Sequence, residues 1–184
     1  WAPQELYPTD PEAAKALHDE AGYGDGFELS ILSIAGNADD AALLTAIQQM
    51  WADVGVTLNI EQVDTATRTD RYRANDFQMR TAAWTNDIND PSQITSYFAI
   101  YEVVESLHTG FQDAELEELF DASQKELDTA ARAEQYARIQ EIYAEAAPII
   151  FLYETPYPVA MGTNVEGFYQ LPLGQNLFTE ATVQ

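Results

Sequence analysis

The first half of the chain switches between two hydrophobic periods. Residues 27–34 (FELSILSI) and 56–63 (VTLNIEQV) carry an apolar side chain at every second position, which predicts two strands. Residues 39–55 (DDAALLTAIQQMWADVG) repeat apolar residues at helical spacing, which predicts a helix that ends at Gly55. Trp51 lies on the apolar stripe of that helix, so it is expected to pack in the core.

Residues 9–27 (TDPEAAKALHDEAGYGDGF) predict a helix with clear ends. Asp10 can cap its start, Pro11 suits its first turn, and Gly22 suits its end. Its histidine, His18, is expected to pack against the rest of the protein. The glycines that follow open a strand and not a helix, which is the reverse of a phosphate-binding loop.

Two further elements complete an alternating series. Residues 66–76 (ATRTDRYRAND) predict a short polar helix, and residues 77–84 (FQMRTAAW) predict a strand. Helices and strands that alternate in this way predict an α/β fold, with a parallel or mixed sheet flanked by helices. In such sheets ligands bind beyond the carboxyl ends of the strands, where Trp84 and the residues after it are expected to lie.

The second half of the chain has a different pattern. Residues 113–127 and 128–148 predict two consecutive amphipathic helices, the second ended by Pro148. The apolar run at residues 149–154 (IIFLYE) predicts a strand buried on both faces. Residues 155–174 are rich in proline and glycine and predict extended segments that pack on another surface. The residues expected to line the two helices are Leu116, Leu119, Phe120, Ser123 and Leu127 in the first, and Tyr136, Ile139, Ile142 and Tyr143 in the second.

The turn at residues 84–90 (WTNDIND) carries the candidate chemistry. An aromatic ring and several acceptors at the end of a strand suit a pocket for a positively charged ligand. Trp84 would cover an apolar part of that ligand, and the Asp87 carboxylate would pair with an ammonium. A structural interpretation is equally consistent with these residue types, with Trp84 as a packing ring and Asp87 as a turn-former or helix cap. The oxygens also suit Ca²⁺, although the spacing and the closing Glu of an EF-hand loop are missing.

Composition narrows the functional classes. The chain of 184 residues has a net charge of −23 and repels phosphate backbones, so we expect no binding to nucleic acid or to anionic membranes. The absence of cysteine excludes disulfides, zinc–thiolate sites and cysteine nucleophiles. The sequence contains no zinc-protease helix, serine-hydrolase elbow or Walker loop, so we do not expect an enzyme. A salt-adapted enzyme domain is the alternative from a different class.

Four longer segments form an ordered series at residues 9–32, 50–64, 75–98 and 139–168. The first runs from Asp-Pro-Glu to Gly-Phe, and the second is a helix-Gly-strand segment. The third runs from Asn-Asp-Phe through Trp-x-x-Asp to Asp-Pro, and the fourth is a helix and an apolar run that end in Val-x-Gly-Phe. In this order they resemble the family 5 extracellular solute-binding proteins, the dipeptide- and oligopeptide-binding proteins of ABC importers.

The resemblance implies a type II periplasmic-binding-protein fold, of which this chain would cover most of the C-terminal lobe. Residues 1–154 would form a ligand-binding lobe that is truncated at its start. Residues 155–184 would form a crossover tail that packs on the N-terminal lobe, which is missing here. The implied function is non-catalytic and needs no cofactor: the receptor captures a peptide by lobe closure and delivers it to the ABC permease in the membrane. The implied location is the periplasm, or the cell surface as a lipoprotein in an organism without an outer membrane.

The same resemblance implies a ligand site at the end of the strand. In peptide-binding members the Asp three residues after the strand-end Trp receives the α-ammonium of the ligand. That residue is Asp87 here, with Trp84 as a wall of the cleft and Thr85 and Asn86 between them. Members also carry sugars, opines and metal chelates, and for such a ligand Trp84 would stack on the solute while Asp87 would accept a hydrogen bond.

Three neighbouring residues bear on this site. Ala83 stands where the family usually has glycine, which narrows the approach to the backbone, and Ile88 stands where an aromatic residue is common. Arg80 shares strand parity with Trp84, so it could meet a ligand carboxylate. Pairing of Arg80 with a surface acid is the preferred interpretation.

Overall fold

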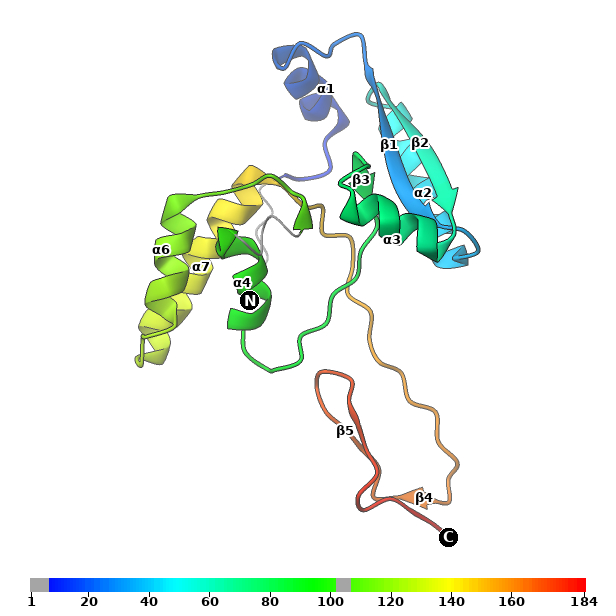
Figure 1. The fold of residues 1–184 in the computed structure, drawn as a ribbon, viewed down its shortest axis with the longest axis vertical. Helices are drawn as coiled ribbons and strands as arrows, with labels where there is room; N and C mark the ends of the chain where they lie inside the picture. Colours follow the sequence, from blue (N-terminus) through cyan, green and yellow to red (C-terminus); the bar gives the residue numbers. More distant parts are fainter. Residues whose placement is uncertain (1–6, 102–106) are drawn as a thin grey trace. The chain divides into compact units, whose positions relative to one another are not determined.

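The computed structural model describes residues 7–101 and 107–184, which fall into two compact units (Figure 1). Residues 7–83 form one unit and residues 84–184 the other. Each unit has a hydrophobic core of its own.

The unit at residues 7–83 is built on a three-stranded parallel sheet. β1 (Phe27–Ile34) is the central strand, with β2 (Val56–Val63) on one side and β3 (Met79–Arg80) on the other. β1 and β2 pair along all eight residues of each strand. Both have the bounds that their alternating patterns predicted, and they are parallel because a helix carries the chain back between them.

Three helices accompany this sheet: α1 (Pro11–Glu20), α2 (Ala38–Ala52) and α3 (Thr65–Arg73). α2 packs on β1 and β2, and α3 packs on β1. The alternation of helix and strand confirms the predicted α/β class. Each helix starts at an acceptor side chain that binds backbone N–H groups of its first turn, as N-capping residues do; the three caps are Asp10, Asn37 and Asp64.

The core of this unit lies between α2 and the sheet. Its buried centre consists of Ile31 from β1, Leu44 from α2 and Leu58 from β2. Trp51 is partly buried and packs against this centre, so the core-packing role expected for it is confirmed. Met50, the residue before Trp51, is 58% exposed, because neighbouring positions of a helix point in different directions and Met50 points away from the sheet.

α1 has no buried residue, and its histidine contacts the rest of the unit. His18 Nδ1 lies 3.0 Å from the carbonyl oxygen of Val54, and the imidazole packs edge-on against Phe27 with ring centroids 5.1 Å apart. The packing role expected for His18 is therefore confirmed.

Two glycines meet where the turns that precede β1 and β2 come together. Gly26 and Gly55 have φ values of +86° and +85°, which side chains of L-residues rarely adopt. The Gly55 carbonyl oxygen accepts a hydrogen bond from Phe27 N at 3.2 Å. A Cβ atom on Gly26 would lie 2.5 Å from that same oxygen. The close approach of the two turns therefore requires glycine at residue 26.

The unit at residues 84–184 has a helical core. It is formed by α4 (Ser92–Ala99), α6 (Ala114–Ser123) and α7 (Thr129–Ala146), in which α6 packs on both α4 and α7. The predicted apolar faces are largely confirmed, because their residues make up most of the buried core: Ala99, Leu116, Phe120, Tyr136, Ile139, Ile142 and Tyr143. The prediction for Leu127 is wrong. α6 ends at Ser123, so Leu127 lies beyond the helix and is 96% exposed.

The C-terminal end of α7 has an unusual cap. Ala147 follows the helix with φ +47° and ψ +44°, in the left-handed region where glycine is the usual residue. Its N–H still donates to the Tyr143 carbonyl oxygen, and Pro148 follows it. The helix thus ends just before Pro148, as predicted, and the chain changes direction at Ala147.

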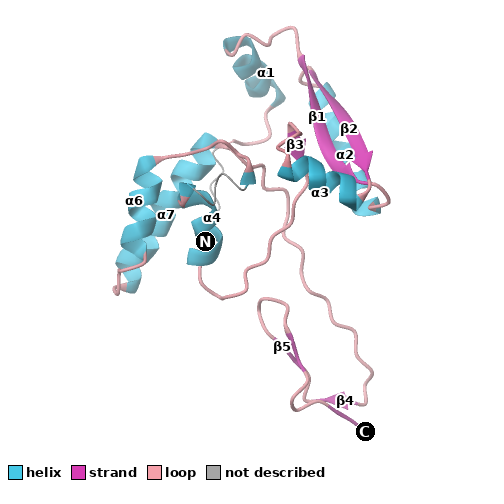
Figure 2. Cartoon of the chain, in the orientation of Figure 1, coloured by secondary structure: helices cyan, strands magenta, loops and turns pink. Residues whose placement is uncertain are grey.

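The strand predicted at residues 149–154 is wrong. This segment is extended but pairs with no strand among residues 7–101 and 107–184, and Figure 2 shows it as loop. Phe151 and Tyr153 are 69% and 65% exposed. An apolar run forms a buried strand only when sheet neighbours satisfy its backbone, and this unit supplies none.

The tail after this segment is extended, as its proline and glycine content predicted. Two short antiparallel pairs interrupt it. They are formed by β4 (Val165–Glu166) with β7 (Thr182–Val183), and by β5 (Tyr169–Gln170) with β6 (Asn176–Leu177). No helix in the part of the chain that the structure describes is both long and apolar enough to cross a membrane.

Candidate functional site

The four predicted site residues follow one another in a loop at the start of the helical unit. The strand predicted for residues 77–84 is confined to β3, so Trp84 lies in an extended loop beyond Arg80 and not at a strand end. Trp84 is 46% exposed. Its ring packs against Tyr97 of α4 with centroids 4.2 Å apart, and its Nε1 donates to Asn86 Oδ1 at 2.9 Å. These contacts hold the ring while leaving much of its surface available.

Asp87 is exposed and is held by a single side chain from α4. Gln93 Nε2 donates to Asp87 Oδ2 at 2.9 Å, and Gln93 Oε1 accepts from Asp87 N at 2.6 Å. The other carboxylate oxygen, Oδ1, accepts no hydrogen bond within residues 7–101 and 107–184. A carboxylate with one oxygen engaged and one available can accept a charge-assisted bond from a cation.

The far end of the loop is anchored by an ion pair. Arg132 of α7 donates from Nη1 to Asp90 Oδ2 at 2.9 Å and from Nη2 to Asp90 Oδ1 at 2.8 Å. Arg132 Nε also donates to the Ser123 carbonyl oxygen at 3.0 Å, and Nη2 donates to the Tyr136 hydroxyl at 3.2 Å. This bidentate pair joins the loop to α6 and α7, and the Arg132 guanidinium holds the pKa of Asp90 well below its usual range.

The two residues between Trp84 and Asp87 take part in local contacts. Asn86 Nδ2 donates to the Asp90 carbonyl oxygen at 3.4 Å, which closes the loop on itself. The Thr85 hydroxyl lies 2.5 Å from the hydroxyl of Tyr157 in the extended tail. Gly174 lies so close to the Tyr157 ring that an added Cβ would come within 2.9 Å of it. Thr85 therefore contacts a residue of the segment predicted to be the crossover tail.

The same geometry bears on the calcium alternative. Asp90 has both carboxylate oxygens bound by Arg132, and Asp87 has one bound by Gln93. Within the described ranges no group of three or more His, Cys, Asp or Glu side chains is placed to hold a metal ion. The acidic residues of the loop are thus occupied mainly by protein donors.

Arg80 belongs to the sheet unit, and its guanidinium lies over the ring of Tyr72 at 4.5 Å from the centroid. Burial lowers its pKa. The interpretation preferred from the sequence is that Arg80 pairs with a surface acid. The structure instead shows its guanidinium against an aromatic ring. Because β3 ends at Arg80, strand parity does not relate Arg80 to Trp84.

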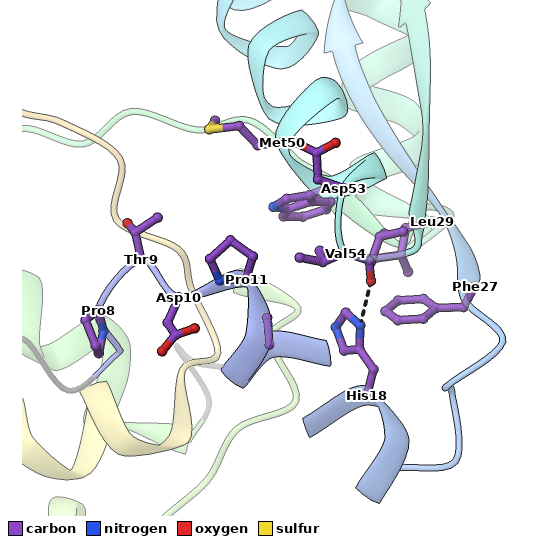
Figure 3. A pocket seen from close by; sticks show the side chains of 13 residues that line it. Pro8, Thr9, Asp10, Pro11, His18, Phe27, Leu29, Met50, Asp53 and Val54 are labelled. Atoms are coloured by element: carbon purple, nitrogen blue, oxygen red, sulfur yellow. Dashed lines mark hydrogen bonds between the residues drawn. The ribbon is translucent and has the colours of Figure 1, made fainter. Parts of the chain in front are cut away.

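A separate apolar cavity of about 530 Å³ lies within the sheet unit, between α1 and the body formed by β1, α2 and β2 (Figure 3). Its lining includes Phe27, Leu29, Met50 and Trp51, together with His18, whose bond to the Val54 carbonyl is drawn in the figure. None of the four predicted site residues lines this cavity.

Sequence reasoning missed the residues that support the loop. Gln93, Tyr97 and Arg132 come from helices, and local periodicity does not distinguish them from ordinary helix-surface residues. Tyr157 was included only as part of a segment rich in proline and glycine. The signal that could have pointed to Arg132 is the excess of acid: with eight basic residues in the whole chain, each is a scarce partner for a carboxylate.

Comparison with known proteins identifies the class to which this chain belongs, the solute-binding proteins. The chain belongs to the bacterial extracellular solute-binding proteins of family 5, whose middle-region model matches residues 1–102. The resemblance stated from the sequence is therefore confirmed.

Individual relatives agree with this family. Heme-binding protein A of Haemophilus influenzae is 27% identical over 182 residues, which are 96% of this chain and 33% of that protein. Oligopeptide-binding protein OppA of Bacillus subtilis is 25% identical over 165 residues, 88% of this chain and 30% of that protein. The chain thus spans about a third of the length of these curated relatives, both of which are named as binding proteins.

The fold is shared with solved structures. The dipeptide-binding protein of Pseudoalteromonas sp. SM9913, solved in complex with Met-Leu, matches 100% of this chain and 38% of its own with a TM-score of 0.76 and 25% identity. HbpA2 of Haemophilus parasuis matches 99% of this chain and 38% of its own, also with a TM-score of 0.76. The predicted type II periplasmic-binding-protein-like α/β fold is confirmed by this likeness.

Proposed function

We propose that this chain forms the C-terminal lobe of a receptor that captures peptides outside the cytoplasm for an ABC importer. Membership of family 5 supports a solute receptor, and the names of several relatives, which include an oligopeptide-binding and a dipeptide-binding protein, support a peptide as the solute. The receptor binds its ligand without turnover. Its location is the periplasm, or the cell surface as a lipoprotein where no outer membrane exists.

The observation that carries the proposal is the exposed carboxylate of Asp87, three residues after the half-exposed ring of Trp84 in the same loop. Asp87 keeps one oxygen without a hydrogen bond from the described residues, which suits the α-ammonium of a peptide. Trp84 offers an aromatic surface for the adjoining part of the ligand. Thr85 and Asn86 set the spacing of these two groups and complete the proposed ligand-binding residues.

Transport would depend on the closure of two lobes. Residues 1–154 supply one lobe, and residues 155–184 pass to the N-terminal lobe and pack on it. The exposed apolar side chains of Phe151 and Tyr153 support such packing, because extended apolar segments are normally covered by another surface. A ligand that bridges both lobes stabilises the closed form, which the permease recognises.

The test is Asp87→Asn in the full-length protein, with Met-Leu and N-acetyl-Met-Leu as probes. Asparagine keeps the size of the side chain and removes its charge. We expect the affinity for Met-Leu to fall roughly 10- to 100-fold, because a charge-assisted bond to the ammonium is lost. Affinity for the acetylated peptide should change little. Both dissociation constants would be measured by isothermal titration calorimetry.

Asp121→Asn, which neutralises an exposed carboxylate on α6, is the matched control and should bind both peptides like the wild type. Unchanged Met-Leu binding in Asp87→Asn would reject the ammonium role. If Trp84→Ala then abolished binding of a sugar, opine or chelate instead, the receptor would remain and the peptide would be the wrong solute.

A further inference from the structure

One side chain makes three hydrogen bonds to the loop at Asp87. Gln93 lies in the first turn of α4, and its side-chain amide reaches back to the loop. Its Oε1 accepts hydrogen bonds from Asp87 N at 2.6 Å and from Ile88 N at 3.1 Å. Its Nε2 donates to Asp87 Oδ2 at 2.9 Å. The amide thus binds the backbone and the carboxylate of the same residue.

The chemistry of this contact is specific to an amide side chain. The arrangement needs an acceptor for two N–H groups and a donor for one carboxylate oxygen, at a fixed distance from each other. Glutamate offers no donor at neutral pH, and lysine offers no acceptor. Asparagine is one methylene shorter, so it would not reach from the same backbone position. Glutamine satisfies all three groups of the loop at once.

The base from which Gln93 reaches is itself fixed. α4 buries Thr95 and Ala99, and Ala99 belongs to the helical core. The Gln93 carbonyl oxygen accepts a hydrogen bond from the Ser96 hydroxyl at 2.7 Å. A side chain that starts from a packed helix and makes three hydrogen bonds has few other rotamers available, so the Asp87 carboxylate is restrained in turn.

We infer that Gln93 is a positioning residue of the ligand site, which orients the Asp87 carboxylate to receive the ammonium of a peptide. This inference rests on the function proposed for Asp87. With Oδ2 bound to Gln93, the carboxylate presents Oδ1 in one orientation and does not rotate away. A preorganised acceptor binds its cation more tightly because less freedom is lost on binding.

The test is Gln93→Met in the full-length protein, which keeps the length of the side chain and removes its three hydrogen bonds. The readout is the ratio of the affinities for Met-Leu and N-acetyl-Met-Leu, measured by calorimetry in the same preparation. We expect this ratio to fall roughly tenfold, because the free-amine peptide alone uses the oriented carboxylate. A ratio taken within one variant does not change when part of the sample is unfolded.

A matched control is available in the same unit. Gln112 also donates from Nε2 to an exposed carboxylate, Glu117 Oε1 at 3.2 Å, but lies outside the loop. Gln112→Met should leave the ratio unchanged. Equal losses for both peptides in Gln93→Met would show a merely structural role and overturn the inference.

A double-variant cycle separates this inference from the proposed function. In an Asp87→Asn background the charged partner is gone, so Gln93→Met should change Met-Leu affinity by less than about twofold. The same loss in both backgrounds would overturn the positioning role while leaving Asp87 as the anchor. No preference for the free amine in the wild type would reject both the proposed function and the role of Gln93.

Discussion

The two compact units each have an apolar core, but the loop of the proposed site in the second unit is held by polar contacts. In residues 7–83 a parallel strand pair and an apolar core under α2 account for the architecture. In residues 84–184 three helices form the core, but the loop that carries Trp84 and Asp87 is held by polar contacts from Gln93 and Arg132. Burial of apolar surface sets the elements in both units, whereas hydrogen bonds and an ion pair set the geometry of the proposed site.

The largest expected effect concerns the core of the sheet unit. Leu58 is 1% exposed and packs with Ile31 and Leu44. Leu58→Ala should lower the free energy of unfolding by about 3 kcal/mol, through lost apolar contact and the cavity left behind. Hydrogen exchange of β1 and β2 amides should accelerate more than that of α6 and α7 amides.

The control for this substitution is Met50→Ala. Met50 is 58% exposed, so the loss should stay below about 0.5 kcal/mol. Equal acceleration of exchange in both units after Leu58→Ala would show that the two units unfold together and do not have independent stabilities.

A smaller effect is expected at the ion pair of the helical unit. Asp90→Asn keeps the size of the side chain but removes one charge from the bidentate contact with Arg132. We expect a loss of about 1 to 2 kcal/mol at pH 7, between the values for exposed and for buried pairs, because Asp90 and Arg132 are 35% and 27% exposed.

The pH dependence of this loss has a defined sign. Because Arg132 lowers the pKa of folded Asp90 below the unfolded value of about 3.9, the stabilisation is complete above that pH. It is lost as the pH falls through the folded pKa. Urea unfolding at pH 7, 5, 4 and 3 should therefore show the wild type approaching Asp90→Asn at acid pH.

An equal difference between the two proteins at pH 3 and pH 7 would contradict this account. Glu115→Gln is the matched control, since Glu115 pairs with Arg138 on the exposed surface at 2.8 Å. That exposed pair is screened by water and salt, so its removal should have a much smaller effect.

The smallest effect is expected at the end of α7. Ala147 has φ +47°, so Ala147→Gly should raise the free energy of unfolding by about 0.5 kcal/mol, the relief of backbone strain exceeding the added freedom of the unfolded chain. Thermal unfolding followed by circular dichroism would detect the shift. Ala146→Gly, one residue earlier in the helix, should instead destabilise by about 0.5 to 1 kcal/mol. A lower midpoint for Ala147→Gly would contradict the strain.

Sequence periodicity predicted β1 and β2 to the residue, because each carries an alternating pattern and finds a neighbour within the same unit. Residues 149–154 are at least as apolar but remain unpaired in the part of the chain that the structure describes. Strand formation needs a partner whose presence a local pattern cannot report. The strand predicted at residues 77–84 is also shorter than expected, because only Met79 and Arg80 pair with β1.

The residues of the proposed site also differ in whether the sequence alone could point to them. Trp84 and Asp87 could be proposed from the sequence through the family resemblance, whereas their residue types alone fitted a structural turn equally well. Gln93 and Arg132 could not, because their roles depend on which way a helix faces after folding. Gln and Arg are common residue types on helix surfaces, so only the tertiary structure reveals that these two side chains contact the loop.

The meeting of Gly26 and Gly55 has a consequence for protein engineering. A designer who wished to graft a new helix or a longer connection in front of β1 could change the exposed positions of α1, but would have to keep the contacts of His18 with the Val54 carbonyl and the Phe27 ring. The junction itself would have to be kept as a fixed module, with glycine at residue 26 and the Gly55 carbonyl in place to receive Phe27 N. Two turns distant in sequence thus behave as one part in any redesign of this unit.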